Sequence, residues 1–294
     1  MKTITITGAT GFVGKNLIFD LIKSKKYYIN IITRNKLKAK KIFGNKVNYF
    51  EWNYKIQDFP EDSVQNSNIF INLMGESITS YSSQKGRKEV YDSRIKSLEK
   101  IIKKIKPNMD LFISASAIQI YKSDFKKIYT ENSKLNKDLS DLQKLCMEWE
   151  DKIKKVSKRS VSLRISPVIT KDSKIVKTFS KTKFLGFILN INYGKPNFSW
   201  IHLDDLIEII KYTIINNKIK GPINCSANSD TKFDDFINAI KNKNTIKINI
   251  PNFISKLVFG RLQDIFLIGC KVKSSKLLDS GFKFKYTDLS DIFN

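Results

Sequence analysis

The sequence predicts an α/β protein with a doubly wound parallel sheet and a smaller C-terminal α+β lobe. Short apolar runs alternate with helix-like stretches through the first 165 residues, and such repetition with right-handed crossovers produces a parallel sheet. The first apolar run ends in three glycines at a spacing of three. After about residue 168 the alternation gives way to loops and short elements, which indicates a change in architecture.

Six runs rich in Ile, Val, Phe and Thr predict the strands, namely Ile4–Thr7, Asn30–Thr33, Val47–Trp52, Ile69–Met74, Leu111–Ser114 and Ser160–Ile165. Helical periodicity predicts helices over Lys88–Ile105, Leu139–Val156 and Asp204–Asn216. We expect one domain over residues 1–220, with lobe-forming loops from about residue 168. A second, small domain is expected over residues 245–292.

Composition limits the classes of function. With 294 residues, of which 41% are hydrophobic, the chain can bury a large core. The formal net charge is +25, but only six of the 53 basic residues are arginines, and the lysines alternate with apolar residues as on solvated helix faces. Nucleic-acid binders more often carry arginine-rich patches with stacking aromatics, so we expect no specific nucleic-acid partner.

Cysteine usage indicates a reducing compartment, and hydropathy indicates that no segment spans a membrane. Cys146, Cys225 and Cys270 are far apart and form no C-x-x-C pair, which favours neither a disulfide framework nor a metal site. No stretch reaches the roughly 18 apolar residues of a membrane span, and a strand begins within a few residues of Met1. We therefore expect no membrane span, no signal peptide and a cytoplasmic location.

The glycines after the first strand predict a dinucleotide site. Such glycines permit a tight turn, close approach of the backbone to a pyrophosphate and close helix packing, and the helix N-terminus adds free N–H groups. A simple helix-entry turn is the alternative, but the position at the first β-α junction favours an NAD(P)-binding Rossmann fold. The residues expected at the pyrophosphate are Gly8, Ala9, Thr10, Gly11, Phe12, Val13 and Gly14.

The end of the second strand predicts which dinucleotide binds. An NAD-binding strand usually ends in Asp or Glu, which accepts a hydrogen bond from the ribose 2′-hydroxyl. Here the strand ends in Thr33 and Arg34, with Lys36 nearby. A guanidinium can bind a 2′-phosphate that a carboxylate would repel, so the sequence favours NADP. The alternative is that Arg34 is merely an exposed arginine of a basic chain.

Seven motifs in order carry a family resemblance, and they are "TGATGFVG", "NLMGE", "RKEVYDSRI", "SASAI", "FSWIHLDDL", "GPIN" and "KLLDSGFKFKYTDL". With these motifs the chain resembles the epimerase-family proteins of the atypical short-chain dehydrogenase/reductase (SDR) superfamily over nearly its whole length. The resemblance implies an NADP-binding Rossmann domain, a small C-terminal domain and a poorly defined reaction. Some family members carry a cell-division-inhibitor label, and a plastid relative is linked to organelle division.

The resemblance also assigns six further residues to the cofactor: Leu73, Met74 and Gly75 beside the adenine and ribose, Glu89 and Arg94 on the next helix, and Val168 near the nicotinamide.

The usual SDR catalytic pair is missing. SDR enzymes use Tyr-x-x-x-Lys on one helix, with a serine on the preceding strand. Ser116 matches the serine, but aligning Glu150 with the superfamily's acidic residue places Leu142 and Cys146 where Tyr and Lys belong. Tyr121, five residues after Ser116, is the candidate phenol. The catalytic residues that the resemblance implies are therefore Ser116 and Tyr121.

Other candidates have weaker support. The motif from Tyr81 to Lys85 follows the wrong strand and is attributed to chance. Cys146 fits an apolar helix face and is expected to be a buried small hydrophobe rather than a nucleophile. His202, the single histidine, is either an acid–base group or a cap of the following helix, with capping favoured. Glu76 is either a base or a turn cap.

Two functions remain open from the sequence. The first is an NADP-dependent oxidoreductase or sugar-nucleotide-type epimerase acting on an unidentified small molecule. The second is a non-catalytic NADP-binding sensor or scaffold with a protein partner, linked to cell or organelle division. The first is the leading hypothesis, and the missing Tyr-Lys pair adds weight to the second, because acid–base chemistry needs a group of suitable pKa within reach.

Overall fold

The computed structural model describes residues 1–293 apart from 107, 136–138, 155 and 260–268. The chain divides into two compact units. Unit 1 comprises Met1–Ser116, Leu145–Leu163 and Ile214–Pro222, and unit 2 comprises Ala117–Lys144, Arg164–Thr213 and Ile223–Asn294. Residues 245–292 therefore belong to unit 2 together with earlier segments, and the domain boundaries expected from the sequence stay a prediction.

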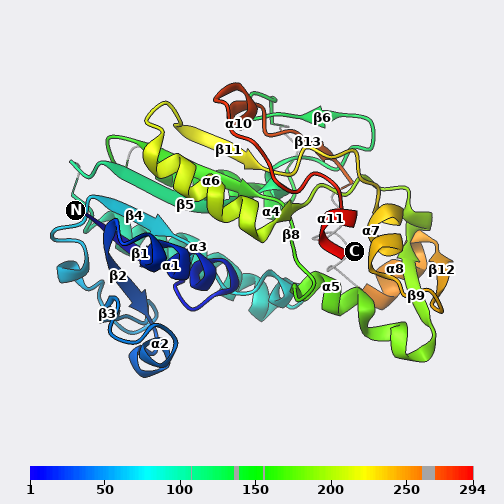
Figure 1. Cartoon of the computed structure of the whole chain (residues 1–294), viewed down its shortest axis with the longest axis horizontal. Coiled ribbons are helices and arrows are strands. Elements are labelled where there is room, and N and C mark those ends of the chain that lie inside the picture. The colour runs from blue at the N-terminus through cyan, green and yellow to red at the C-terminus, as the bar shows by residue number, and fades with distance from the viewer. Residues whose placement is uncertain (107, 136–138, 155, 260–268, 294) are drawn as a thin grey trace. The chain divides into compact units, whose positions relative to one another are not determined.

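Seven strands form the main sheet, in the order β11-β7-β5-β4-β1-β2-β3 (Figure 1). Their bounds are β1 Lys2–Thr7, β2 Tyr27–Thr33, β3 Asn48–Glu51, β4 Ile69–Asn72, β5 Leu111–Ala117, β7 Ser160–Ile165 and β11 Gly221–Cys225. The pairings among β3, β2, β1, β4 and β5 are all parallel. The predicted doubly wound α/β fold is confirmed, and each of the six predicted strands overlaps an observed one.

The sequence missed β11, which contains Pro222 and lies at an edge of the sheet. Proline removes a backbone donor, so a run that contains it does not read as a strand, although an edge position tolerates it.

Helices connect the strands of unit 1. They are α1 Phe12–Ser24, α2 Lys36–Phe43, α3 Gln84–Ile102 and α4 Asp141–Ile153, the last of which begins in unit 2. From β1 the chain winds outward through β2 and β3, and from β4 it winds the other way through β5. Right-handed crossovers in opposite directions place α1 and α3 on opposite faces of the sheet. Strands β1, β2 and β4 are accordingly buried over most of their lengths.

Unit 2 is built from short elements in three two-stranded parallel sheets. The pairs are β8 Val168–Ile169 with β10 Ile201–His202, β9 Phe187–Ile191 with β12 Ile246–Ile250, and β6 Ile128–Tyr129 with β13 Lys271–Val272. Its helices are α5 Lys174–Phe179, α6 Leu203–Ile215, α7 Phe233–Ile240, α8 Asn252–Phe259, α10 Ser275–Asp279 and α11 Ser290–Phe293, of which α6 ends in unit 1. An aromatic cluster forms its core, with Phe179, Phe198, Phe233 and Phe236 all buried.

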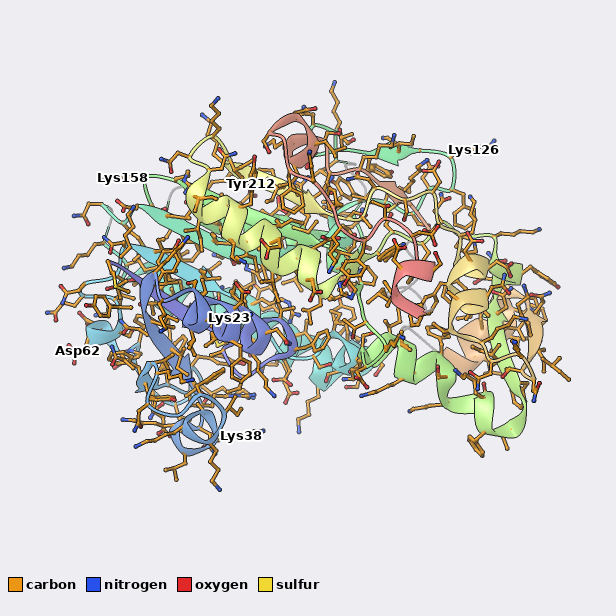
Figure 2. The ribbon with its side chains drawn as sticks, in the orientation of Figure 1. Lys23, Lys38, Asp62, Lys126, Lys158 and Tyr212 are labelled. Carbon is orange, nitrogen blue, oxygen red and sulfur yellow. The ribbon has the colours of Figure 1, made fainter. Side chains whose placement is uncertain are left out.

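The described residues that are buried include no lysine, as the alternation of lysines with apolar residues predicts. Lys23 on α1, Lys38 on α2, Lys126 and Lys158 are exposed (Figure 2). No helix among the described residues combines the length and apolar character needed to cross a membrane.

Candidate dinucleotide-binding site

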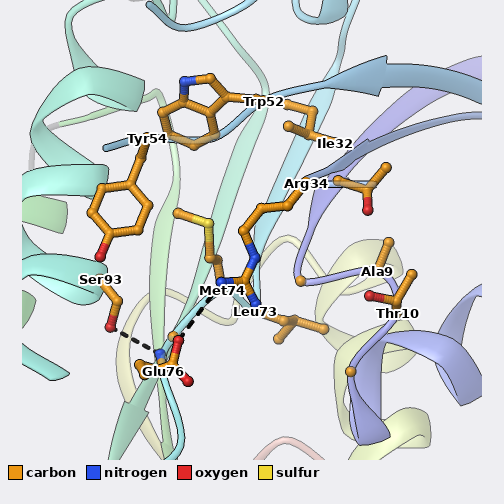
Figure 3. A pocket seen from close by; sticks show the side chains of 14 residues that line it. Ala9, Thr10, Ile32, Arg34, Trp52, Tyr54, Leu73, Met74, Glu76 and Ser93 are labelled. Carbon is orange, nitrogen blue, oxygen red and sulfur yellow. Dashed lines mark hydrogen bonds and ion pairs between the residues drawn. The ribbon is translucent and has the colours of Figure 1, made fainter. Parts of the chain in front are cut away.

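A cavity of about 280 Å³ opens in unit 1 where four neighbouring strands end (Figure 3). Its lining residues lie at the end of β2 or just after β1, β2, β3 and β4, with one residue from α3, and they are Gly8, Ala9, Thr10, Gly11, Ile32, Thr33, Arg34, Trp52, Tyr54, Leu73, Met74, Gly75, Glu76 and Ser93. The winding direction of the sheet reverses between β1 and β4. Doubly wound proteins bind their ligands outside the carboxyl ends of the strands at such a reversal.

The glycine loop packs so closely against neighbouring backbone that a side chain is excluded at two of its positions. Gly8 has a φ of +72°, and a Cβ atom there would lie 2.4 Å from the Leu73 carbonyl oxygen. A Cβ at Gly14 would lie 2.3 Å from the Gly8 carbonyl oxygen. The loop therefore brings bare backbone to the cavity wall and lets α1 begin close to β1, as a phosphate-binding turn requires.

The N-terminus of α1 offers unblocked donors. Gly11 occupies the N-cap, no side chain caps the helix, and its first turn holds no acidic residue. The first N–H groups of a helix have no partner within the helix and favour an anion. Of the predicted pyrophosphate residues, Gly8 to Gly11 line the cavity, while Phe12 and Val13 open the helix.

Arg34 lies where β2 ends, as the sequence predicted. Its side chain is 65% exposed, and its Nη1 lies 3.8 Å from Oε2 of Glu76. Thr33 beside it is buried, and the Asn35 side chain caps α2 by accepting a hydrogen bond from the Lys38 N–H at 2.8 Å. No carboxylate stands at the end of β2 itself. Lys36 is exposed and does not line the cavity.

The segment after β4 is held by two adjacent residues of α3. The Glu76 N–H donates to Ser93 Oγ at 2.8 Å, and Arg94 Nη1 donates to the Glu76 carbonyl oxygen at 3.0 Å. The Arg94 guanidinium lies 5.4 Å from the Trp149 ring centroid and packs against Gly75, where a Cβ would lie 3.1 Å from Cζ. Burial lowers the pKa of Arg94. Arg94 thus positions the cavity wall rather than lining the cavity.

Four lining residues were not singled out from the sequence, namely Ile32, Trp52, Tyr54 and Ser93. Trp52 is buried and donates from Nε1 to the Gln57 carbonyl oxygen at 3.3 Å, and burial raises the pKa of Tyr54. Trp52 ends a predicted strand, so the rule that ligands meet strand ends could have found it. Glu89, which the resemblance assigned to the cofactor, lies partly buried on α3 outside the lining set.

Ser116 lies near the end of β5, in unit 1. Its hydroxyl is buried and donates to Glu150 Oε1 on α4 at 2.8 Å. On the same helix Cys146 is buried, and Leu142 is partly exposed. The expected apolar role of Cys146 agrees with this burial.

Tyr121 and Val168 lie in unit 2. The Tyr121 hydroxyl accepts a hydrogen bond from Arg164 Nη1 at 2.8 Å and faces two acceptors, Asn224 Oδ1 at 2.7 Å and the Thr130 carbonyl oxygen at 3.0 Å. Burial raises the pKa of Tyr121 to about 12. Val168 lies in β8, and its contact with a nicotinamide stays a prediction.

His202 is a helix cap. Its Nδ1 accepts a hydrogen bond from the Asp204 N–H at 3.2 Å, where α6 begins, so the favoured structural role is confirmed. Among the described residues, no three His, Cys, Asp or Glu side chains are grouped so that they could hold a metal ion.

Comparisons with known proteins agree with this geometry. A model of the NAD dependent epimerase/dehydratase family matches residues 4–225, and a model of a domain of unknown function, DUF1731, matches residues 250–293. The chain is 30% identical to the chloroplastic epimerase family protein SDR39U1 homolog of Arabidopsis thaliana, over 98% of this chain and 85% of that protein. It is 27% identical to the epimerase family protein YfhF of Bacillus subtilis, over 97% and 95%.

Solved structures share the fold. The human epimerase family protein SDR39U1 (isoform 2), solved with NADPH, gives a TM-score of 0.81 at 22% identity, covering 99% of this chain and 97% of that one. The UDP-glucuronic acid 4-epimerase of Bacillus cereus, solved with UDP-glucuronic acid and NAD, gives 0.78 at 16% identity, covering 99% and 96%. From the glycine loop, the cavity at the strand ends and the family match over residues 4–225, the chain belongs to the NAD dependent epimerase/dehydratase family.

Proposed function

We propose that this protein binds NADP in the cavity of unit 1 and acts as an oxidoreductase or a sugar-nucleotide-type epimerase on a small molecule. The position of Arg34 carries the proposal, because among the described lining residues it is the one cation, and β2 ends without a carboxylate. A guanidinium can bind a 2′-phosphate in bidentate fashion. The human relative SDR39U1 was solved with NADPH, and its likeness to this chain supports the same type of cofactor here.

The residues present fit this cofactor. The bare backbone from Gly8 to Gly11 and the uncapped N-terminus of α1 would hold the pyrophosphate, and Arg34 would hold the 2′-phosphate. A bound nicotinamide would supply hydride transfer. Arg94 and Ser93 would keep the wall after β4 in place, since they hold both backbone groups of Glu76.

The catalytic part of the proposal assigns Ser116 to a substrate oxygen and Tyr121 to hydrogen-bond donation. The Ser116 hydroxyl now donates to Glu150, so it would exchange that acceptor for substrate. Tyr121, with a pKa raised to about 12, stays protonated at neutral pH. To donate a hydrogen bond to substrate, it would exchange its present acceptors, Asn224 and the Thr130 carbonyl oxygen, and with this pKa it would be a weak general acid at that pH.

Arg34→Asp tests the proposal. It should narrow or invert the preference for NADPH over NADH, because the carboxylate repels the 2′-phosphate and can accept from a 2′-hydroxyl. The measurement is the pair of dissociation constants from isothermal titration. Lys36→Asp is the matched control, since Lys36 carries the same charge outside the lining set. An unchanged ratio in Arg34→Asp would show that the phosphate is held elsewhere, with Lys36 and Lys38 as the next candidates.

The second candidate is a non-catalytic NADP sensor or scaffold that presents a surface to a protein partner in cell or organelle division. One observation favours it: α4 carries Leu142 and Cys146 where SDR enzymes carry Tyr and Lys. The two candidates differ in turnover. Incubation with NADPH or NADP⁺ and a panel of carbonyl compounds, alcohols and nucleotide sugars, followed by NMR of the products, gives new products only for the enzyme.

A further inference from the structure

We infer that Glu76 is a specificity-determining residue of the cavity, whose carboxylate occupies Arg34 in the absence of a 2′-phosphate and opposes the binding of that phosphate. The inference rests on the proposed NADP function. Arg34 follows β2 and Glu76 follows β4, and β1 separates these strands in the sheet. The pair at 3.8 Å therefore spans the cavity from one wall to the other, as the dashed line between them shows (Figure 3).

The backbone of Glu76 is fixed. Ser93 accepts its N–H and Arg94 donates to its carbonyl oxygen, so α3 holds both polar groups of the same residue. Gly75 before it packs against the Arg94 guanidinium. The carboxylate can turn away from Arg34 by rotating its side chain, but the segment that carries it is held against α3.

The Glu76 carboxylate opposes phosphate binding through its negative charge. Glu76 is the one acidic residue among the described lining residues, in a chain of net charge +25. The Arg34 and Glu76 side chains are 65% and 38% exposed, and an ion pair of this kind contributes only about 0–1 kcal/mol. A phosphate with about two negative charges displaces it from the guanidinium. The displaced carboxylate then stands near the phosphate, and the like charges repel.

Glu76→Gln isolates this effect, because the amide keeps the size of the side chain and the substitution keeps both backbone hydrogen bonds. We expect the NADPH dissociation constant to fall about threefold to tenfold, as the loss of a weak pair and of a repulsion allows. The NADH dissociation constant should change less than about twofold, since NADH has no 2′-phosphate to compete for Arg34. Isothermal titration of the purified full chain measures both without any need for turnover.

Two controls distinguish the local effect of Glu76 from the general effect of removing one negative charge from the protein. Glu51→Gln removes the same charge from β3, beside Thr33 of β2, at an exposed residue outside the lining set. It should leave the NADPH dissociation constant unchanged. In an Arg34→Met background, Glu76→Gln should tighten NADPH binding less than it does in the wild-type background, because the competition for Arg34 is gone and only the repulsion of the phosphate remains.

Wild-type protein that fails to bind NADPH would overturn both this inference and the proposed function. If the wild-type protein binds NADPH and the Glu76→Gln variant binds it equally well or more weakly, this inference alone is overturned. The proposed function then still stands. An equal gain for NADH, an equal gain in Glu51→Gln, or an undiminished gain from Glu76→Gln in the Arg34→Met background would each overturn the inference as well.

Discussion

Two constraints act on Gly8. One comes from its own backbone conformation, and the other comes from the segment that follows β4. The Gly8 φ of +72° is a conformation that residues other than glycine rarely adopt, and a Cβ there would clash with the Leu73 carbonyl oxygen. Gly11 meets a milder limit, because a Cβ there would lie 3.1 Å from the Gly8 carbonyl oxygen without a positive φ. These two positions therefore differ in what a methyl group would cost.

Gly8→Ala should lower the free energy of unfolding by about 1–3 kcal/mol, because strain and a clash with backbone add together. Gly11→Ala, as the matched variant in the same loop, should cost clearly less. Urea unfolding followed by circular dichroism measures both. Gly8→Ala that is as stable as the wild type would show that the loop can move away from β4.

At this scale the sequence predicted what depends on neighbours along the chain. The glycine spacing and the Arg34 position at a strand end are local features, and the structure places both at the cavity. The Glu76 contacts with Ser93 and Arg94 span 17 and 18 residues and depend on how α3 returns along the sheet. Periodicity and spacing carry no such information, so the sequence left the role of Glu76 open between a base and a turn cap and did not single out Ser93.

Among the elements, β10 ends just before α6 in the chain's single histidine, a side chain whose ordinary pKa lies near neutrality. His202 is buried, and its ring centroid lies 3.7 Å from that of Tyr286. Burial lowers its pKa; Asp204 and Asp205 oppose this to a smaller extent, and Lys285 adds the smallest contribution, in the lowering direction. A lowered pKa means that the unfolded chain binds the proton first as pH falls.

The contribution of His202 to stability is thus present above its ordinary pKa of about 6.5 and is lost as pH falls through the lowered folded pKa. His202→Asn keeps a side-chain acceptor for the cap but removes the titration. We expect the free energy of unfolding of the wild type to fall between pH 7 and 5 more steeply than that of the variant. Urea unfolding across that range tests this, and equal slopes would contradict it.

The strands show why element-level prediction succeeded in unit 1 and less so in unit 2. Strands buried on both faces read as apolar runs, which the sequence displays directly. In unit 2, β12 pairs with β9 about 60 residues earlier, and β13 pairs with β6 more than 140 residues earlier. These pairs are two to five residues long, and short strands with distant partners leave little local pattern.

At the scale of the whole molecule, we propose that the cavity of unit 1 selects NADP over NAD. The most direct measurement is isothermal titration of the wild-type chain with NADPH and, separately, with NADH. We expect NADPH to bind at least about tenfold more tightly than NADH, equivalent to about 1.4 kcal/mol, because Arg34 contacts the 2′-phosphate. Equal affinities, or tighter binding of NADH, would contradict it.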